Sequence, residues 1–249
     1  MSFVRETRAD AVVHVVGEYY RQAMISLARP PGPTDLPPGL PPPPSGHYKA
    51  LLMPEPKNRY DPNAIMVLLW AGRHWVHVGY LSRESAIEYQ PVFAYLGGGS
   101  TTPAATKPHC LACDAALIRE RDGMGVVLNL GTPAEIIADL WIDDHPLRTD
   151  HPWHGRLISF TGAERTAIAG APIDRHAQRL LARRAGCLVA PRVTKKVEAL
   201  VAADDQDETA NLLRAREYGI PIVREVDFLI AIGLDPELVS RAPGRWVRG

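Results

Sequence analysis

One short stretch of the chain concentrates side chains that could recognise a ligand. It carries Asn58, Arg59, Tyr60, Asp61 and Asn63. The flanking segments 51–53 and 64–70 are apolar, and the second is rich in residues that favour strands, which predicts strand, ordered turn and strand. Asn and Asp in turns commonly bond to their own backbone. A cation, an aromatic ring, a carboxylate and two amides between buried strands also suit a recognition loop.

Three motifs in the first half of the chain resemble one known family. The central motif is Pro54-Glu-Pro-Lys-Asn-Arg-Tyr-Asp-Pro-Asn-Ala-Ile65, which resembles the signature of the HIRAN domain. Upstream lies Val15-Val-Gly-Glu-Tyr-Tyr20 and downstream Val78-Gly-Tyr-Leu-Ser-Arg-Glu84, in the family's order. The resemblance implies a small, curved β-barrel related to oligonucleotide-binding and SH3-like barrels. In helicase-associated members it also implies binding to single-stranded DNA with a free 3′ end.

The resemblance also implies which residues contact DNA. The matching positions are Tyr19, Tyr20, Asn58, Tyr60, Asp61 and Tyr80. Aromatic rings stack on unpaired bases of any sequence, and an amide and a carboxylate could read a terminal sugar hydroxyl. Phosphates could be met by Lys57, Arg59 and Arg83. The alternatives are barrel packing for Tyr19 and Tyr60 and an ordinary turn for Asp61. Glu18 departs from the family, because helicase-linked members carry arginine there, and a carboxylate would repel phosphate.

Bulk properties limit the possible partners. The 249 residues contain 28 Lys+Arg and 28 Asp+Glu, so a nucleic-acid site must be a local patch. The three cysteines, Cys110, Cys113 and Cys187, cannot all pair with one another, and we expect reduced thiols. We find no signal peptide and no apolar stretch of about twenty residues. The expected location is the cytoplasm, in association with the nucleoid.

The first half predicts an all-β domain with short helices at 8–142. Strands are expected at 11–16 and 73–81, a helix from Ser82 to about Leu96, and a hairpin formed by 110–119 and 125–130. A short helix at 134–141 would close the domain. The proline-rich insertion 29–45 excludes helix and central strand, and predicts an exposed spacer or a ligand for an aromatic groove.

The second half has a different pattern, with strands and helices in alternation over 155–240. Strands are expected at 156–161, 187–190, 197–202 and 220–223, and helices at 171–185, 209–218 and from Val226. Pro172 and Gly186 suit the start and the end of the first helix. This order predicts an α/β unit with a four-stranded parallel sheet and about three helices. The whole chain is then α+β, with two domains and a linker at 143–154.

This second domain resembles the BRCT family. The similarity is carried by Phe160-Thr-Gly162, Ala185-Gly186, Leu200-Val-Ala202, Ala215-Arg-Glu-Tyr-Gly-Ile-Pro-Ile-Val223 and Phe228-Leu229. In the family's phosphopeptide binders, a Ser/Thr-Gly pair and a lysine hold the phosphate. Thr161 and Gly162 fit the pair, Asn211 occupies the lysine position, and Arg214 is the candidate replacement. The alternative is that Thr161 only completes the turn after its strand.

A basic stripe marks the outer face of the first helix of this domain. It consists of Arg175, Arg179 and Arg183, each four residues from the next. The stripe could follow a DNA backbone, although a solvated surface is the more ordinary interpretation.

No enzyme or metal site is predicted. The sequence lacks a Walker phosphate loop, a G-x-S-x-G elbow and an H-E-x-x-H helix. His109, Cys110 and Cys113 lack the second ligand pair of a structural zinc site. The carboxylates and imidazoles between Asp143 and His154 could hold the metal of a nuclease, but we favour a linker there.

These patterns predict a non-enzymatic accessory protein of DNA repair or replication, without a cofactor. The barrel would bind single-stranded DNA or DNA 3′ ends, and the second domain would dock a repair protein or DNA. The alternative is a protein-interaction module, through phosphopeptide or partner binding, without DNA-end binding.

Overall fold

The fold is described from a computed structural model. The structure describes residues 4–6, 12–28, 30–31, 36, 40, 42–72, 74–97, 109–121, 123–145, 147–162, 166–203 and 209–241. Internal contacts divide the chain into two compact units, residues 1–131 and 132–249, and each unit is described by itself.

The first unit is a closed antiparallel barrel. Its strands are β2 (Val12–Val16), β3 (Tyr48–Pro54), β4 (Ile65–Trp70), β5 (Trp75–Leu81), β6 (Cys110–Glu120) and β7 (Gly123–Asn129). The order around the ring is β6-β3-β4-β5-β2-β7, and β7 pairs back with β6. A short strand, β1 (Val4–Glu6), adds to β6 in parallel. The predicted barrel is confirmed, and closure leaves no open edge among these six described strands.

Strand alternation places an apolar core inside the barrel. Ile65, Val67 and Leu69 of β4 are fully buried, whereas Met66 and Leu68 between them are only partly buried. A second apolar cluster contains Leu51, Cys110 and Ala112, with Leu40, Met53, Leu68 and Trp75 packed against it. The proline-rich insertion therefore contacts the barrel through Leu40, while its other described positions are exposed or partly exposed.

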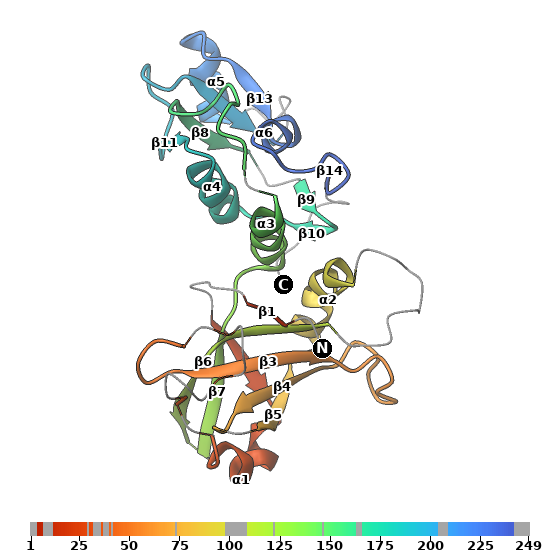
Figure 1. Ribbon diagram of the computed structural model, residues 1–249. Coiled ribbons are helices and arrows are strands. Elements are labelled where there is room, and N and C mark those ends of the chain that lie inside the picture. Colours follow the sequence, from red (N-terminus) through yellow and green to blue (C-terminus); the bar gives the residue numbers. More distant parts are fainter. Residues whose placement is uncertain are drawn as a thin grey trace. The chain divides into compact units, whose positions relative to one another are not determined.

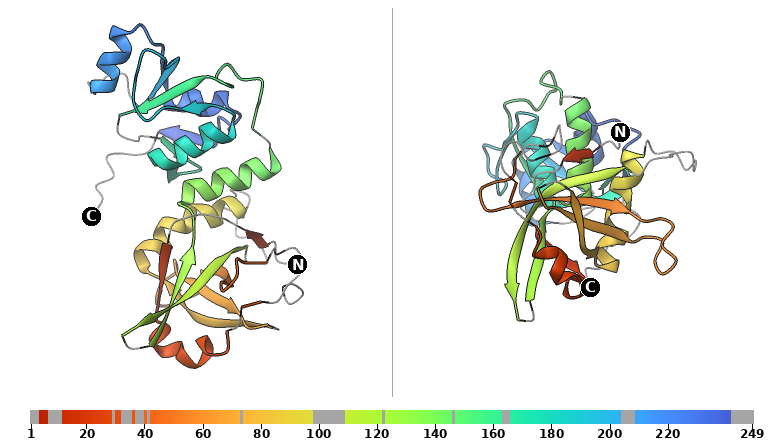
Figure 2. Two further views of the ribbon diagram at one scale, coloured as in Figure 1. Left: turned by 90° about the vertical axis from the view of Figure 1, so that its left-hand side faces the viewer. Right: turned by 60° about the horizontal axis from the view of Figure 1, so that its bottom comes forward.

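Helices lie at opposite ends of this barrel (Figures 1 and 2). One end carries a 3₁₀ helix, η1 (Glu18–Arg21), and the short α1 (Gln22–Ile25). The other end carries α2 (Arg83–Leu96), whose predicted cap is confirmed: the Ser82 hydroxyl oxygen accepts from the Ser85 N–H at 3.1 Å.

The second unit is built on a four-stranded parallel sheet, as predicted. Its order is β11 (Leu188–Val189), β8 (Leu157–Thr161), β12 (Ala199–Ala202) and β13 (Ile222–Arg224). Leu200 and Ala202 cluster with Leu212 of α5 (Ala210–Glu217). Phe160 of β8 contacts Phe228 of α6 (Glu225–Ala231), with ring centroids 5.7 Å apart.

A small antiparallel sheet in the second unit was not predicted. Its order is β10 (Ala171–Pro172), β9 (Thr166–Ile168) and β14 (Val239–Arg241). Positive φ angles at Ala169 and Gly170 form the two-residue turn between β9 and β10. The predicted helix over 171–185 therefore began too early. Asp174 caps α4 (Arg175–Arg184) by accepting the Ala177 N–H at 2.8 Å, and Pro172 lies in a strand.

The division between the units differs from the predicted domain boundary. The helix α3 (Pro133–Asp144), expected to close the barrel, belongs to the second unit, where it packs against β9, β10 and α4. The expected linker 143–154 is also bonded into this unit. The Arg148 N–H donates to Ile232 O at 3.1 Å, and the His151 imidazole is 2.8 Å from Ala185 O. Apolar and backbone contacts, rather than a change in composition, mark this boundary.

Candidate nucleic-acid interface

The predicted recognition loop lies where four parts of the barrel meet. The loop, 55–64, joins Pro54 at the end of β3 to Ile65 at the start of β4, and these two residues are paired. The next residue of β4, Met66, pairs with Tyr80 of β5, and Tyr80 also pairs with Val16 at the end of β2. Because η1 follows Val16 after a single glycine, the sheet register brings the loop, Tyr80 and η1 to the same region.

A β-bulge in β5 determines which side chains surround Tyr80. Val67 pairs with Gly79 and Leu68 with His77, so Val78 is the extra residue. Residues three apart normally face opposite sides of a strand, but the bulge places His77 beside Tyr80, with ring centroids 4.8 Å apart. A Cβ at Gly79 would lie 2.5 Å from Val16 O, so the close approach of β2 to the bulge requires glycine.

The recognition loop is ordered by its own polar side chains. The Asn58 Nδ2 donates to Glu55 Oε2 at 3.1 Å, while Asn58 Oδ1 accepts the Tyr60 N–H at 3.0 Å. Asp61 Oδ1 accepts the Asn63 N–H at 2.9 Å. These bonds are the ordinary turn roles expected of Asn and Asp. They also fix the amide and the carboxylate in place, so both groups would meet a ligand without further ordering.

Two tyrosines extend into solvent from this region. Tyr20 of η1 is 87% exposed, and Tyr60 of the loop is 89% exposed. The Arg59 guanidinium lies 5.5 Å from the centroid of the Tyr60 ring. Arg83 is also exposed, with its Nε 4.0 Å from Asp61 Oδ2. Large exposed rings contribute little to folding, and they are the groups on which unpaired bases stack.

The electrostatics of the region centre on His77 and Tyr80. Burial raises the pKa of Tyr80, and the Glu55 carboxylate raises it further through its charge and a hydrogen bond. Burial lowers the pKa of His77, the Arg21 guanidinium lowers it further, and the Gly79 carbonyl and Glu55 act in the opposite direction. A cation from η1 and a carboxylate from the loop therefore act on the same two rings.

Comparison with known families gives a direct result for this part of the chain. The family model of the HIRAN domain matches residues 12–100. Residues 12–100 form a HIRAN domain. No curated protein matches the chain. The HIRAN domain implies DNA binding, and the match spans the strands, the loop and the helix η1 that form the region described above.

The predicted contact residues of the HIRAN domain fall into two groups. The structure brings together the loop residues, Tyr20 and Tyr80, whereas the side chain of Tyr19 lies outside the described residues. Sequence reasoning missed Arg21, Glu55 and His77. Glu55 could have been found, because it lies three residues before Asn58 at the start of the loop. His77 could not, because only the bulge turns it to the same face as Tyr80.

The predicted phosphate-binding residues of the second unit are more dispersed. The Thr161 and Thr209 hydroxyl oxygens are 2.8 Å apart, and Thr209 is the N-cap of α5. Gly162 follows β8, and its carbonyl accepts from Arg175 Nη2 at 2.7 Å. Arg214 lies in the last turn of α5, exposed and away from the cap. Arg214, the candidate cation, therefore does not lie beside the pair Thr161 and Gly162.

The basic stripe of α4 is the main correction to the sequence analysis. Arg175 is 16% exposed and forms an ion pair with Glu225, which is 2% exposed, at 3.2 Å. Arg175 also donates to the carbonyl of Thr161 at 3.0 Å and lies over the Phe160 ring. The Arg179 Nε is buried, and of the three arginines only Arg183 is exposed. The three arginines therefore do not form one solvated face.

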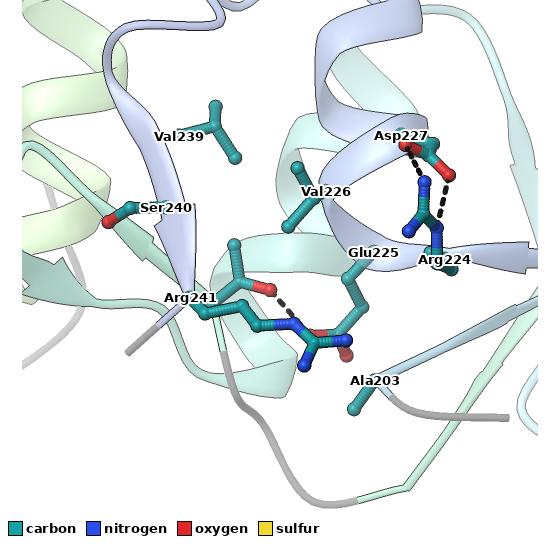
Figure 3. A pocket seen from close by; sticks show the side chains of 9 residues that line it. Ala203, Arg224, Glu225, Val226, Asp227, Val239, Ser240 and Arg241 are labelled. Atoms are coloured by element: carbon teal, nitrogen blue, oxygen red, sulfur yellow. Dashed lines mark hydrogen bonds and ion pairs between the residues drawn. The ribbon is translucent and has the colours of Figure 1, made fainter. Parts of the chain in front are cut away.

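Glu225 also lines a small cavity in the second unit. The cavity has a volume of about 190 Å³. Thr166 Oγ1 donates to Glu225 Oε2 at 2.9 Å. Figure 3 shows Glu225 and Arg241 among the residues that line the cavity, and Arg224 in a two-bond ion pair with Asp227. The polar groups that face the cavity are therefore largely engaged with one another.

The histidines and carboxylates of the predicted linker have structural partners. His154 Nδ1 is 3.2 Å from the same Ala185 carbonyl that His151 contacts. Asp150 forms a two-bond ion pair with Arg148, which lowers the pKa of Asp150. Among the described residues, no group of three or more His, Cys, Asp or Glu is placed to hold a metal ion. No helix in the described ranges is long and apolar enough to cross a membrane.

Proposed function

We propose that the barrel binds single-stranded DNA or DNA 3′ ends, and that the chain is a non-enzymatic accessory protein of DNA repair or replication. The observation that carries this proposal is the pair of exposed rings, Tyr20 and Tyr60, beside a loop whose Asn58 and Asp61 are already fixed. Rings that stack on bases give affinity without sequence preference. The absence of Walker, G-x-S-x-G and H-E-x-x-H motifs from the sequence supports an accessory role.

Recognition of a free end would come from the loop. A terminal 3′ hydroxyl is a hydrogen-bond donor that an internal nucleotide lacks. The carboxylate of Asp61 can accept this bond, because among the described residues Oδ1 accepts only the Asn63 N–H and Oδ2 forms only a long ion pair, 4.0 Å, with the exposed Arg83. A 3′ phosphate would instead place negative charge against the carboxylate. The site thus suits a free 3′ hydroxyl and disfavours a blocked one.

A comparison of DNA ends tests this function. We expect the full chain to bind a single strand with a free 3′ hydroxyl about tenfold or more tightly than the same strand with a 3′ phosphate, since hydrogen bonds to charged groups contribute about 1.5–3 kcal/mol. Blunt duplex DNA should bind more weakly than either strand. Fluorescence anisotropy with strands labelled at the 5′ end measures this. Equal affinity for free and blocked 3′ ends would contradict end recognition.

A second function is proposed for the second unit, whose four-stranded parallel sheet is compatible with the predicted resemblance to a BRCT domain. Its parallel sheet and the hydroxyl pair Thr161–Thr209 at the start of α5 favour docking of a partner, with a phosphorylated peptide as the candidate ligand. The same unit would carry the whole function if the barrel did not bind DNA. A salt titration distinguishes DNA binding by the barrel from partner docking by the second unit alone, since DNA binding through phosphates weakens steeply as the salt concentration rises.

Replacement of Thr161 by valine tests the docking proposal. The variant keeps the shape of the side chain and removes the hydroxyl, so phosphopeptide binding should be lost while oligonucleotide binding is unchanged. Titration with a phosphorylated peptide library and with its unphosphorylated counterpart measures the effect. If valine leaves phosphopeptide affinity unchanged, the hydroxyl pair is only part of the turn after β8.

A further inference from the structure

Arg21 is a partly buried cation whose backbone is held in place by its neighbours. Within the part of the chain that the structure describes, its guanidinium forms no hydrogen bond or ion pair. The next residue, Gln22, bonds to both peptide groups of Met124 in β7, donating to Met124 O at 2.8 Å and accepting from Met124 N at 2.9 Å. Ile25 of α1 is also buried. The backbone that carries Arg21 is therefore held against the barrel.

The position of Arg21 on η1 also matters. A 3₁₀ helix has about three residues per turn, so residues three apart lie on the same side. Glu18 and Arg21 are related in this way within η1. The helix therefore presents a cation one turn beyond the carboxylate that would repel phosphate. η1 packs against β5, the strand of His77 and Tyr80, and the positive charge of Arg21 acts to lower the pKa of both side chains.

His77 can supply a second cation at the same place. Its Nε2 is 3.0 Å from Gly79 O and donates to this carbonyl, so a neutral ring presents Nδ1 as an acceptor. Protonation turns Nδ1 into a donor that could meet a phosphate oxygen. The charged groups that act on His77 are Arg21 from η1 and Glu55 from the loop, and Tyr80 is the titratable ring in contact. Arg21 and Glu55 carry opposite charges, so protonation of His77 adds one positive charge to this group.

We propose that Arg21 and His77 form a phosphate-binding subsite of the DNA interface, which holds a backbone phosphate of the strand whose bases contact the neighbouring tyrosines. This inference rests on the proposed function of the barrel. The geometry supports it because η1 packs against β5, so its anchored backbone carries Arg21 near the strand that holds His77 and Tyr80. When a DNA phosphate binds at this subsite, His77 takes up a proton.

The proton uptake gives a signed pH dependence. Burial and Arg21 hold the pKa of His77 below its ordinary value of 6.5 in the free protein. A bound phosphate raises this pKa, because its negative charge favours the imidazolium. DNA affinity should therefore increase as pH falls through the pKa of the complex, and level off below the pKa of the free protein. The plot of log affinity against pH should approach a slope of about −1 between them.

The experiment measures anisotropy of a 5′-labelled strand of about ten nucleotides, a length within the usual site sizes of single-strand-binding barrels. It compares the full chain with the variants Arg21→Gln, Arg21→Lys and His77→Gln. In a salt titration, Arg21→Gln should reduce the steepness of log affinity against log salt by about 0.7. Arg21→Lys should restore the steepness, because the charge is kept. His77→Gln should remove the pH dependence.

The matched control is Arg183→Gln, which removes an exposed arginine from the second unit and should leave both slopes unchanged. Circular dichroism verifies that each variant is folded. If wild type binds and neither Arg21→Gln nor His77→Gln alters its slope, the subsite is overturned while the proposed function stands. If the wild-type chain binds no strand at all, the proposed function fails and the subsite fails with it.

Discussion

Replacing Tyr20 and Tyr60 together by alanine should weaken binding to single-stranded DNA by about 30-fold or more. Each base that stacks on an aromatic ring contributes about 1–3 kcal/mol, so two rings contribute at least about 2 kcal/mol. The rings are 87% and 89% exposed, and their loss should leave the thermal stability of the barrel nearly unchanged. Anisotropy with a 5′-labelled strand measures the affinity, and a thermal melt measures the stability.

Two further variants distinguish stacking from other roles of the rings. Phenylalanine at both positions keeps the ring and removes the hydroxyl, so it should retain most of the affinity if stacking dominates. Leu188→Ala removes an exposed apolar side chain, 58% exposed, from the second unit and should have no effect. A folded double alanine variant that binds as tightly as wild type would show that DNA lies on another face of the barrel.

The sequence predicts the recognition loop well because its interactions are local. Asn58 and Asp61 bond to backbone groups two or three residues away, and such bonds depend only on the nearby chain. The Ser82 cap of α2 is local in the same way. By contrast, the placement of His77 beside Tyr80 depends on a bulge, which forms where β4 and β5 pair. No pattern within 75–81 indicates which residue of β5 is the extra one.

The second unit shows a related limit of sequence reasoning. Helical spacing tells which residues share a face, but it does not tell whether charged residues on that face meet solvent or a buried partner. The partner of Arg175 is Glu225, fifty residues later, at the first position of α6. The helix α3 is ambiguous for the same reason. Its apolar residues would suit either unit, and contacts with β9, β10 and α4 decide between them.

Arg175 leads to the second large expected effect. Changing Arg175 to methionine should destabilise the second unit by about 3–5 kcal/mol, because it leaves the Glu225 carboxylate buried without its cation. The variant also removes the donor to the carbonyls of Thr161 and Gly162. For a unit of this size the loss corresponds to a fall in Tm on the order of 10–30 °C. Thermal and urea denaturation of the full chain measure it.

Arg183→Met provides the matched control, since it makes the same chemical change on the same helix at an exposed position. It should alter the unfolding free energy by no more than about 0.5 kcal/mol. Adding Glu225→Gln to Arg175→Met should recover part of the lost stability, because the buried group is then neutral and the two sites are coupled. DNA binding should stay with the barrel in all these variants under conditions where it remains folded. If Arg175→Met and Arg183→Met cost the same, Arg175 is a solvated surface residue and its contacts with Glu225 and Phe160 contribute nothing measurable to the fold.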